Sequence, residues 1–272
     1  MKISNILNRR NRILLRELVV TDFKLRYQGS TLGYLWSLLK PLFLFGILYL
    51  VFGTALKFGA KIPHYPVYLL LGIVLWNFFS EATKQGAAAI VGSGSLLRKI
   101  NLPRYIVVVS ATVSALINLC LNLVVVFFFV VINHTEVQPM ALVLFPLLIL
   151  ELYVFSLAIA FFLSAINVRY RDIQHIWDVF VQAGFYATPI IFTVSMVFER
   201  SETIAFWMLA LNPMAQIIQD ARSLLITPAT QTLSELSHGM TIYLLPLAII
   251  STVTLLSSIY FRKRSKSFAE DV

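Results

Sequence analysis

The sequence predicts an all-α integral membrane protein with six transmembrane helices. Hydrophobic residues make up 58% of the 272 residues and charged residues 13%, whereas soluble domains average about 25% charged residues. The mean hydropathy is +0.81. The apolar residues form long stretches separated by short charged clusters, a pattern typical of a chain that crosses a bilayer several times.

Residues 1–33 are predicted to form an N-terminal amphipathic interface segment ahead of a six-span transmembrane domain over residues 34–272. A helix over residues 3–26 would carry basic residues on one face and leucines on roughly the opposite one: Arg9, Arg12 and Arg16 against Leu7, Leu14 and Leu18. Such a helix suits the headgroup layer of a membrane; in the alternative, its leucines pack on another part of the protein. The segment has no apolar run of signal length, so we expect no cleavable signal.

The predicted spans are each close to the ~20 residues that cross the hydrocarbon core. They cover residues 35–56, 67–90, 105–132, 141–166, 176–197 and 242–261. Between the last two lies the stretch 203–226, which Asn212-Pro213 breaks into halves too short to cross. We expect a re-entrant pair of short helices there, covered by protein or lining a wet cavity. The alternative is a seventh span.

The distribution of Lys and Arg predicts the orientation. Most of the 22 Lys and Arg residues fall in the N-terminal segment, the second and fourth connections and the C-terminal tail. Because basic residues are retained in the cytoplasm, both termini are predicted to be cytoplasmic, which argues against a seventh span. The same placement beside apolar spans explains the net charge of +9 without a nucleic-acid partner.

The chain lacks the sequence signatures of an enzyme. No stretch fits the phosphate-binding pattern G-x-x-x-x-G-K-[ST]; Gly92-Ser93-Gly94 has no strand before it and Leu97 stands where a third glycine belongs. The single cysteine, Cys120, allows no intrachain disulfide or cysteine metal site. The histidines are scattered: His64, His134, His175 and His238. We therefore expect a binding or transport subunit with no catalytic residue, no metal and no cofactor of its own.

One predicted cytoplasmic connection has the composition of a protein contact. The segment SLLRKINLPR combines leucines and an isoleucine with basic residues, and its contact residues would be Leu96, Leu97, Arg98, Lys99, Ile100, Asn101, Leu102 and Pro103. An apolar ridge with charged flanks suits binding in the groove of a partner. A turn that rests on the lipid surface would have the same composition, and the residues alone do not separate the two.

Several motifs in order resemble one family along nearly the whole chain. They are FKLRYQGS (23–30), LGYLW (32–36), Lys40-Pro41, GIVLWNFFSE (72–81), the segment 96–104, NVRYRDI (167–173), Thr188-Pro189-Ile190, Leu211-Asn212-Pro213 and Arg222. In this spacing they look like the permease subunit of type-2 ABC exporters for polysaccharides. That family exports O-antigen, capsule, wall teichoic acid and related lipid-linked glycans.

The resemblance implies partners and a location. In that family two permease chains form a homodimer in the cytoplasmic (inner) membrane of a bacterium, and two separate ATPase subunits bind ATP and Mg. Residues 96–103 match the coupling helix that contacts the ATPase, and the N-terminal helix matches the interface helix. The stretch 203–226 matches the gate helices, with Asn212, Pro213 and Arg222 as gate residues.

Aromatic residues are the predicted lining of a glycan channel, because sugars offer apolar ring faces and a fringe of hydroxyls. The predicted residues are Tyr34, Trp36, Phe43 and Tyr49 on the first span and Phe185 and Tyr186 on the fifth. In the alternative, these aromatics form an interface belt or pack between helices.

Charged residues near or within the spans add two further predictions. Glu151 falls in the middle of the fourth span, where a carboxylate avoids lipid; it either pairs with Arg222 or is protonated and bonded to a neighbouring helix. Arg169, Arg171 and Asp172 lie at the predicted cytoplasmic mouth. They either set the topology or form an entrance that binds the anionic head of a lipid-linked substrate.

Three other functions predict features that differ from those of a polysaccharide exporter. A type-2 ABC permease for lipid or drug efflux would have a larger external domain and a shorter interface helix. An ion-coupled secondary carrier would show internal repeats and several charges at the midplane. A membrane-embedded enzyme of glycan assembly would need a cluster of acid and base groups near one face.

Overall fold

The computed structural model describes residues 9–27, 32–33, 35–57, 62–99, 102–236 and 244–265. Within these ranges the regular structure is helical, and five helical segments are long and apolar enough to cross a membrane. They are α2 (Leu35–Leu48) with its π-helical continuation η2 (Tyr49–Ala55), α3 (Tyr65–Gly92), α5 (Arg104–Ile132), α6 (Ala141–Asn167) and α12 (Leu244–Arg264). Their bounds agree with five of the predicted spans to within a few residues.

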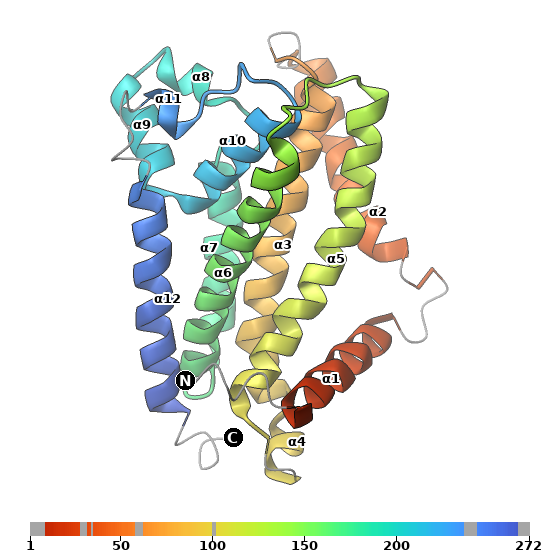
Figure 1. The fold of residues 1–272 in the computed structure, drawn as a ribbon, viewed down its shortest axis with the longest axis vertical. Helices are drawn as coiled ribbons and strands as arrows, with labels where there is room; N and C mark the ends of the chain where they lie inside the picture. Colours follow the sequence, from red (N-terminus) through yellow and green to blue (C-terminus); the bar gives the residue numbers. More distant parts are fainter. Residues whose placement is uncertain are drawn as a thin grey trace.

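Helix α3 lies at the centre of the bundle. It packs against α2, α5, α6 and α7 and is buried along most of its length (Figure 1). Small residues allow the close approach of α3 to α6: a Cβ added to Gly86 would collide with the Cβ of Ala160. Inside a bilayer the hydrophobic effect does not drive helices together, so helix association depends on close van der Waals packing of small residues.

The prediction of a continuous fifth span over residues 176–197 is wrong. Helix α7 (Ile173–Ala187) has 15 residues, a length of about 22 Å against the ~30 Å of the hydrocarbon core. It ends because Pro189 disfavours a helical conformation at the preceding residue, and Thr188 is extended with ψ 141°. The chain then continues without helix to Thr193. We call residues 188–193 the α7–α8 link.

Four short helices lie in the upper part of the bundle in Figure 1. They are α8 (Val194–Phe198), α9 (Glu202–Leu211), α10 (Pro213–Leu225) and α11 (Leu233–Leu236). The predicted break at Asn212-Pro213 is confirmed: Asn212 Oδ1 accepts hydrogen bonds from the N–H groups of Met214 and Ala215 at 3.1 and 3.3 Å. Proline suits the next position because it has no N–H to satisfy. The break excludes a continuous seventh span.

Helix α10 is buried inside the protein. It packs against α3, α6, α9 and α12, and all but one of its side chains are buried. A short helix at this depth is tolerated because protein covers its ends.

Helix α1 (Arg9–Tyr27) packs beside the lower part of α5 (Figure 1). Val19 is buried, and Asn11 Nδ2 donates to the Tyr105 hydroxyl at 3.2 Å. Arg9, Arg12 and Arg16 are exposed, whereas Leu14 and Leu18 are half-buried; Leu7 lies outside the described residues. The packing that the sequence left as the alternative is therefore present, and contact of the basic face with a membrane stays a prediction.

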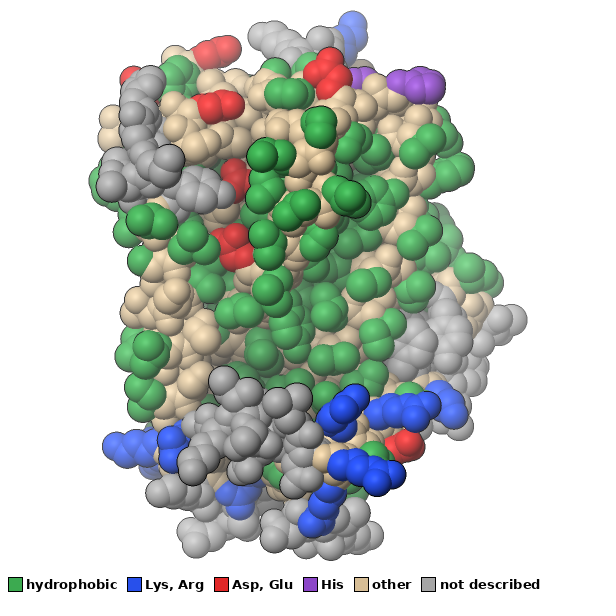
Figure 2. Space-filling model, viewed as in Figure 1, with side chains coloured by type: hydrophobic (Ala, Val, Ile, Leu, Met, Phe, Trp, Pro, Cys, Tyr) green, Lys and Arg blue, Asp and Glu red, His purple; other side chains and the backbone are tan. Residues whose placement is uncertain are grey.

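The surface divides into layers along the long axis. Figure 2 shows hydrophobic side chains over the middle of one face and Lys and Arg side chains gathered at its lower end. Helix α1 and the C-terminal end of α12 lie at this end, which we call the basic end (Figure 1). An apolar middle between polar ends is the surface expected of a membrane-embedded chain.

Candidate functional site

A polar groove of about 960 Å³ lies between α2, α3 and α5. Helix α3 contributes Asn77, Glu81 and Gln85, which are four residues apart and therefore share one face. Helix α5 contributes Asn118 and Asn122, again four apart. Lys40 and Lys84 also line this groove.

Amide groups hold the one carboxylate in this groove. Asn118 Nδ2 donates to both carboxylate oxygens of Glu81 at 3.1 and 2.9 Å, and Gln85 Nε2 donates to Oε1 at 2.9 Å. Asn122 Nδ2 donates to the Asn118 carbonyl at 2.8 Å. Buried or half-buried polar groups need such partners. The groove therefore has a fixed polar wall, rich in amides, between helices that are otherwise apolar.

The predicted channel aromatics do not form one lining. Trp36 lines the polar groove, whereas Tyr49 and Phe185 pack against the hydrophobic core. Phe43 and Tyr186 are 61% and 64% exposed on the outer surface of the chain. Tyr34 lies outside the described residues.

The predicted contact segment forms a shorter helix than expected. Helix α4 (Gly94–Lys99) includes Leu96 and Leu97, both half-buried, and the backbones of Arg98 and Lys99. The side chains of Arg98 and Lys99, and all of Ile100 and Asn101, lie outside the described residues. Leu102 is buried and Pro103 precedes α5 in an extended conformation, so neither extends an exposed helical ridge. The physical reason is that proline ends the helical conformation of the residue before it.

The predicted entrance residues are exposed at the basic end. Arg169, Arg171 and Asp172 lie in the turn between α6 and α7. The Arg169 guanidinium carbon lies 5.4 Å from the centre of the Tyr170 ring. Their exposure is compatible with either predicted role.

Arg222 is fully buried and binds three backbone carbonyls. Its Nε donates to the Tyr68 carbonyl at 3.1 Å, Nη1 to the Pro189 carbonyl at 2.5 Å and Nη2 to the Ile190 carbonyl at 2.8 Å. Its Cζ lies 3.4 Å from the centre of the Tyr68 ring, a cation–π contact. Arg222 therefore ties α10 to α3 and to the α7–α8 link, where the chain leaves its helix and exposes carbonyls.

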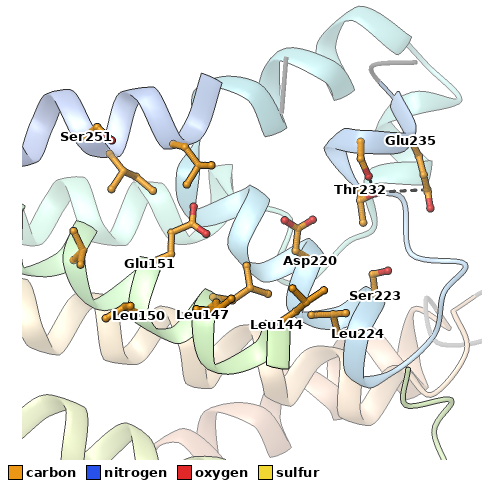
Figure 3. A pocket seen from close by; sticks show the side chains of 15 residues that line it. Leu144, Leu147, Leu150, Glu151, Asp220, Ser223, Leu224, Thr232, Glu235 and Ser251 are labelled. Atoms are coloured by element: carbon orange, nitrogen blue, oxygen red, sulfur yellow. Dashed lines mark hydrogen bonds between the residues drawn. The ribbon is translucent and has the colours of Figure 1, made fainter. Parts of the chain in front are cut away.

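The predicted pairing of Glu151 with Arg222 is wrong. Glu151 instead shares a largely apolar groove of about 870 Å³ with Asp220, between α6, α10 and α12 (Figure 3). Asp220 Oδ2 accepts from Gln216 Nε2 at 2.6 Å, and Glu151 Oε1 has no hydrogen-bond partner among the described residues.

Sequence reasoning missed several polar contacts. It did not predict the Glu81–Asn118 contact, the Asp220 side chain in the second groove, the ion pair of Lys84 with Asp178 at 2.8 Å, or the Trp177 Nε1 bond to Thr83 Oγ1 at 2.9 Å. The signal for the first was present, since Asn118 and Asn122 recur at helical spacing in an apolar run. Among the described residues no group of three His, Cys, Asp or Glu side chains could hold a metal ion.

The chain is similar to proteins of one known family over most of its length. The ABC-2 type transporter family model matches residues 13–226. The O-antigen export system permease protein RfbA of Myxococcus xanthus is 31% identical over 260 residues, which cover 95% of each chain. The protein of the same name from Klebsiella pneumoniae is 28% identical over 250 residues, covering 92% of this chain and 91% of the relative. A family match over most of the chain, together with a bundle of long apolar helices, shows that the chain belongs to the ABC-2 type transporter family.

Proposed function

We propose that the chain is the permease subunit of an ATP-driven exporter that moves a lipid-linked polysaccharide, such as an O-antigen, across the bacterial inner membrane. The observation that carries the proposal is the similarity to O-antigen export permeases over nine-tenths or more of both chains. The polar groove between α2, α3 and α5 is compatible with this cargo, because amide groups bind hydroxyls through both donors and acceptors.

The basic end is proposed to face the cytoplasm. Lys and Arg gather there beside the apolar middle (Figure 2), and basic residues are retained on the cytoplasmic side during insertion. Both termini would then be cytoplasmic, and α8 to α11 would lie on the outer side.

A second protein, an ATPase, would drive transport by contacting this chain at α4. Two copies of the chain would form the pore, and two ATPase subunits would bind ATP and Mg and contact Leu96 and Leu97 together with the basic residues that follow. Helix α4 supports this assignment because it lies at the basic end (Figure 1) and Leu97 also packs against a hydrophobic cluster that contains residues of α3, α5, α6 and α12. A motion of α4 would therefore be transmitted to the spans that meet in this cluster.

Purification of the intact chain from its own membrane tests the partner. An ATPase subunit should co-purify with it, and its absence from every gentle preparation would contradict the proposal. Depletion of the chain in cells should trap lipid-linked glycan in the cytoplasmic leaflet. An unchanged leaflet distribution would count against glycan as the cargo.

Charge reversal tests the role of α4. Arg98→Glu combined with Lys99→Glu should abolish export while the complex still hydrolyses ATP, because the contact that transmits ATPase closure is lost. The matched control is Arg262→Glu combined with Lys263→Glu at the exposed C-terminal end of α12, which changes the charge of the basic end equally but outside α4. Undiminished export by the α4 variant would refute the coupling assignment.

A further inference from the structure

The polar groove between α2, α3 and α5 lies at the depth of the membrane-spanning helices. Glu81 and Asn118 line it near the middle of α3 and of α5. Helix α2 is fixed against α5 at this groove. Pro41 has no N–H to donate to the Ser37 carbonyl, and Asn122 Nδ2 donates to that carbonyl at 3.4 Å instead. The groove is therefore enclosed by spans that are tied to one another.

Lys40 brings a cation without a counter-charge into this groove. It lies within α2, lines the groove and is exposed. Its side chain makes no ion pair and no hydrogen bond to any residue that the structure describes. A lysine among apolar spans is unfavourable unless it faces a partner, a wet cavity or a transported ligand. Lys40 is accessible from the groove and is free to bind a ligand.

The other charged residues of the groove have partners within the protein. The Glu81 carboxylate accepts three hydrogen bonds from amide groups, at 2.9 to 3.1 Å. The ammonium group of Lys84 lies 2.8 Å from Asp178, which is not part of the lining. The lining therefore has two cations and one carboxylate, and an anionic ligand would meet the unpaired charge of Lys40.

Asn77 adds an accessible hydrogen-bond donor to the same groove. Its side-chain amide makes no hydrogen bond within the described ranges, and the residue is half-buried. Its amide atoms are not among the unpaired polar atoms that are sealed inside the protein. Trp36, Leu44 and Phe78 line the groove with apolar surface. Donors of hydrogen bonds, a cation and apolar side chains thus meet in one place.

These features match the phosphate of a lipid. A phosphate carries the missing negative charge and accepts hydrogen bonds on several oxygens, and lysine is a common phosphate ligand. A free anion would have to leave water to enter a groove between apolar spans, whereas a lipid brings its phosphate together with a hydrocarbon chain. The volume of about 960 Å³ is at the upper end of the ~300–1,000 Å³ of small-molecule sites, which leaves room for neighbouring atoms of the lipid.

We propose that this groove binds the phosphate of a lipid, with Lys40 as the charged ligand and Asn77 as a hydrogen-bond donor. Two sources fit this chemistry: an anionic lipid-linked substrate and an anionic phospholipid of the bilayer. The first source rests on the proposed function, but the groove and its unpaired cation do not depend on it.

Native mass spectrometry of the full-length chain tests the proposal, with the chain purified in a neutral maltoside detergent together with any ATPase subunit that accompanies it. One arm adds lipid-linked glycan extracted from the same cells, and the other adds phosphatidylglycerol. At least one lipid should bind, and Lys40→Gln should weaken its binding by about 10-fold or more, the effect of one lost hydrogen bond from a charged donor. Asn77→Ala should weaken binding by about 3-fold, because a neutral donor is lost.

Two controls separate ligand binding from a structural role. Lys40→Arg, which keeps the charge, should retain binding, and so should Lys57→Gln, since Lys57 is exposed beyond the end of η2 and does not line the groove. Without added lipid, the Tm of Lys40→Gln should equal or exceed that of the wild type, because an unpaired charge leaves the spans. A lower Tm would show that Lys40 contacts the protein itself and would overturn its assignment to the lipid.

The outcomes separate this proposal from the function. Tighter binding of the lipid-linked glycan identifies the substrate as the source, and equal or tighter binding of phosphatidylglycerol identifies a membrane lipid; the phosphate site stands in both cases. If neither lipid binds, or binding is unchanged in Lys40→Gln, while the wild-type complex exports glycan, the phosphate site is refuted. If phosphatidylglycerol binds through Lys40 but no ATPase associates and no glycan is exported, the site stands and the exporter function fails.

Discussion

Replacing Arg222 with Met tests whether the buried guanidinium holds the upper half of the bundle together. Met has a similar length and is apolar, so it removes the charge and all donors while filling much of the volume. The substitution removes the hydrogen bonds that Arg222 donates to carbonyls on two elements. These are the carbonyl of Tyr68 on α3 and those of Pro189 and Ile190 in the α7–α8 link. The α7–α8 link should lose more stability than α3, because residues 188–193 are not in a helix.

The size of the effect follows from these contacts. Two link carbonyls left without this donor cost about 1–3 kcal/mol each, or roughly 2–6 kcal/mol together. Removing a buried charge recovers part of its desolvation free energy, so we expect the lower part of this range, about 2–4 kcal/mol. For a chain of this size about 2–4 °C of melting temperature corresponds to each kcal/mol. The Tm should therefore fall by roughly 4–16 °C.

The assay is thermal unfolding of the purified protein in one detergent, followed by tryptophan fluorescence. The Tm of Arg222→Lys should lie between those of the wild type and Arg222→Met. The ammonium group of Lys keeps the charge but lacks the planar guanidinium that reaches several carbonyls. Arg200→Met is the control, since Arg200 is exposed. A Tm of Arg222→Met within about 1 °C of wild type would refute the reasoning.

Gly72 provides a second route to the same contact. A Cβ at this position would lie 2.5 Å from Arg222 Nη2 and 3.3 Å from both Arg222 Cζ and Ile190 Cγ2. Gly72→Ala should therefore lower stability by about 1–3 kcal/mol through overpacking. In the Arg222→Met background much of that loss should disappear, giving a coupling free energy above about 0.5 kcal/mol. Strictly additive losses would show that the alanine strains something else.

Two further predictions follow from the packing and charge of α3. Gly86→Ala should separate α3 from Ala160 on α6 and lower stability by about 1–3 kcal/mol. The control Gly46→Ala should be close to neutral, because a Cβ at Gly46 meets nothing within 4 Å. Equal melting temperatures for the two variants would contradict the close contact at Gly86. Lys84→Gln should change stability by less than about 1 kcal/mol, because both members of the Lys84–Asp178 pair are largely exposed, and a larger loss in unfolding measurements would assign that pair a structural role.

Most of the helical architecture could be predicted from apolar length alone. Five predicted spans agree with the structure because ~20 apolar residues have few ways to satisfy their backbone outside a helix. The exception is the predicted span 176–197, where hydropathy remains high through Thr188-Pro189-Ile190 although the helix ends there. Proline chemistry could have marked that boundary, but a hydropathy window does not register it.

The candidate site was predictable only in part. Costly polar residues such as Glu151 and Arg222 stand out in apolar surroundings, and both prove to be buried or half-buried at helix contacts. The lining aromatics could not be chosen, because the sequence gives the helix face that an aromatic occupies but not whether it meets lipid, core or groove there. Trp36 and Phe43 are seven residues apart on α2, yet only Trp36 lines the polar groove.

The failure of the predicted Glu151–Arg222 pair has a simple geometric cause in α10. Successive residues of a helix turn by about 100°, so Asp220 and Arg222, two apart, leave α10 on nearly opposite sides. Gln219 shares the face of Arg222 and Gln216 shares that of Asp220, as their hydrogen bonds show. Once Arg222 faces α3, Asp220 has to face the groove of Glu151. Spacing alone gives α10 these two polar faces. Which neighbour receives the cation depends on the carbonyls that the α7–α8 link exposes, and these are brought beside α3 only in the folded bundle.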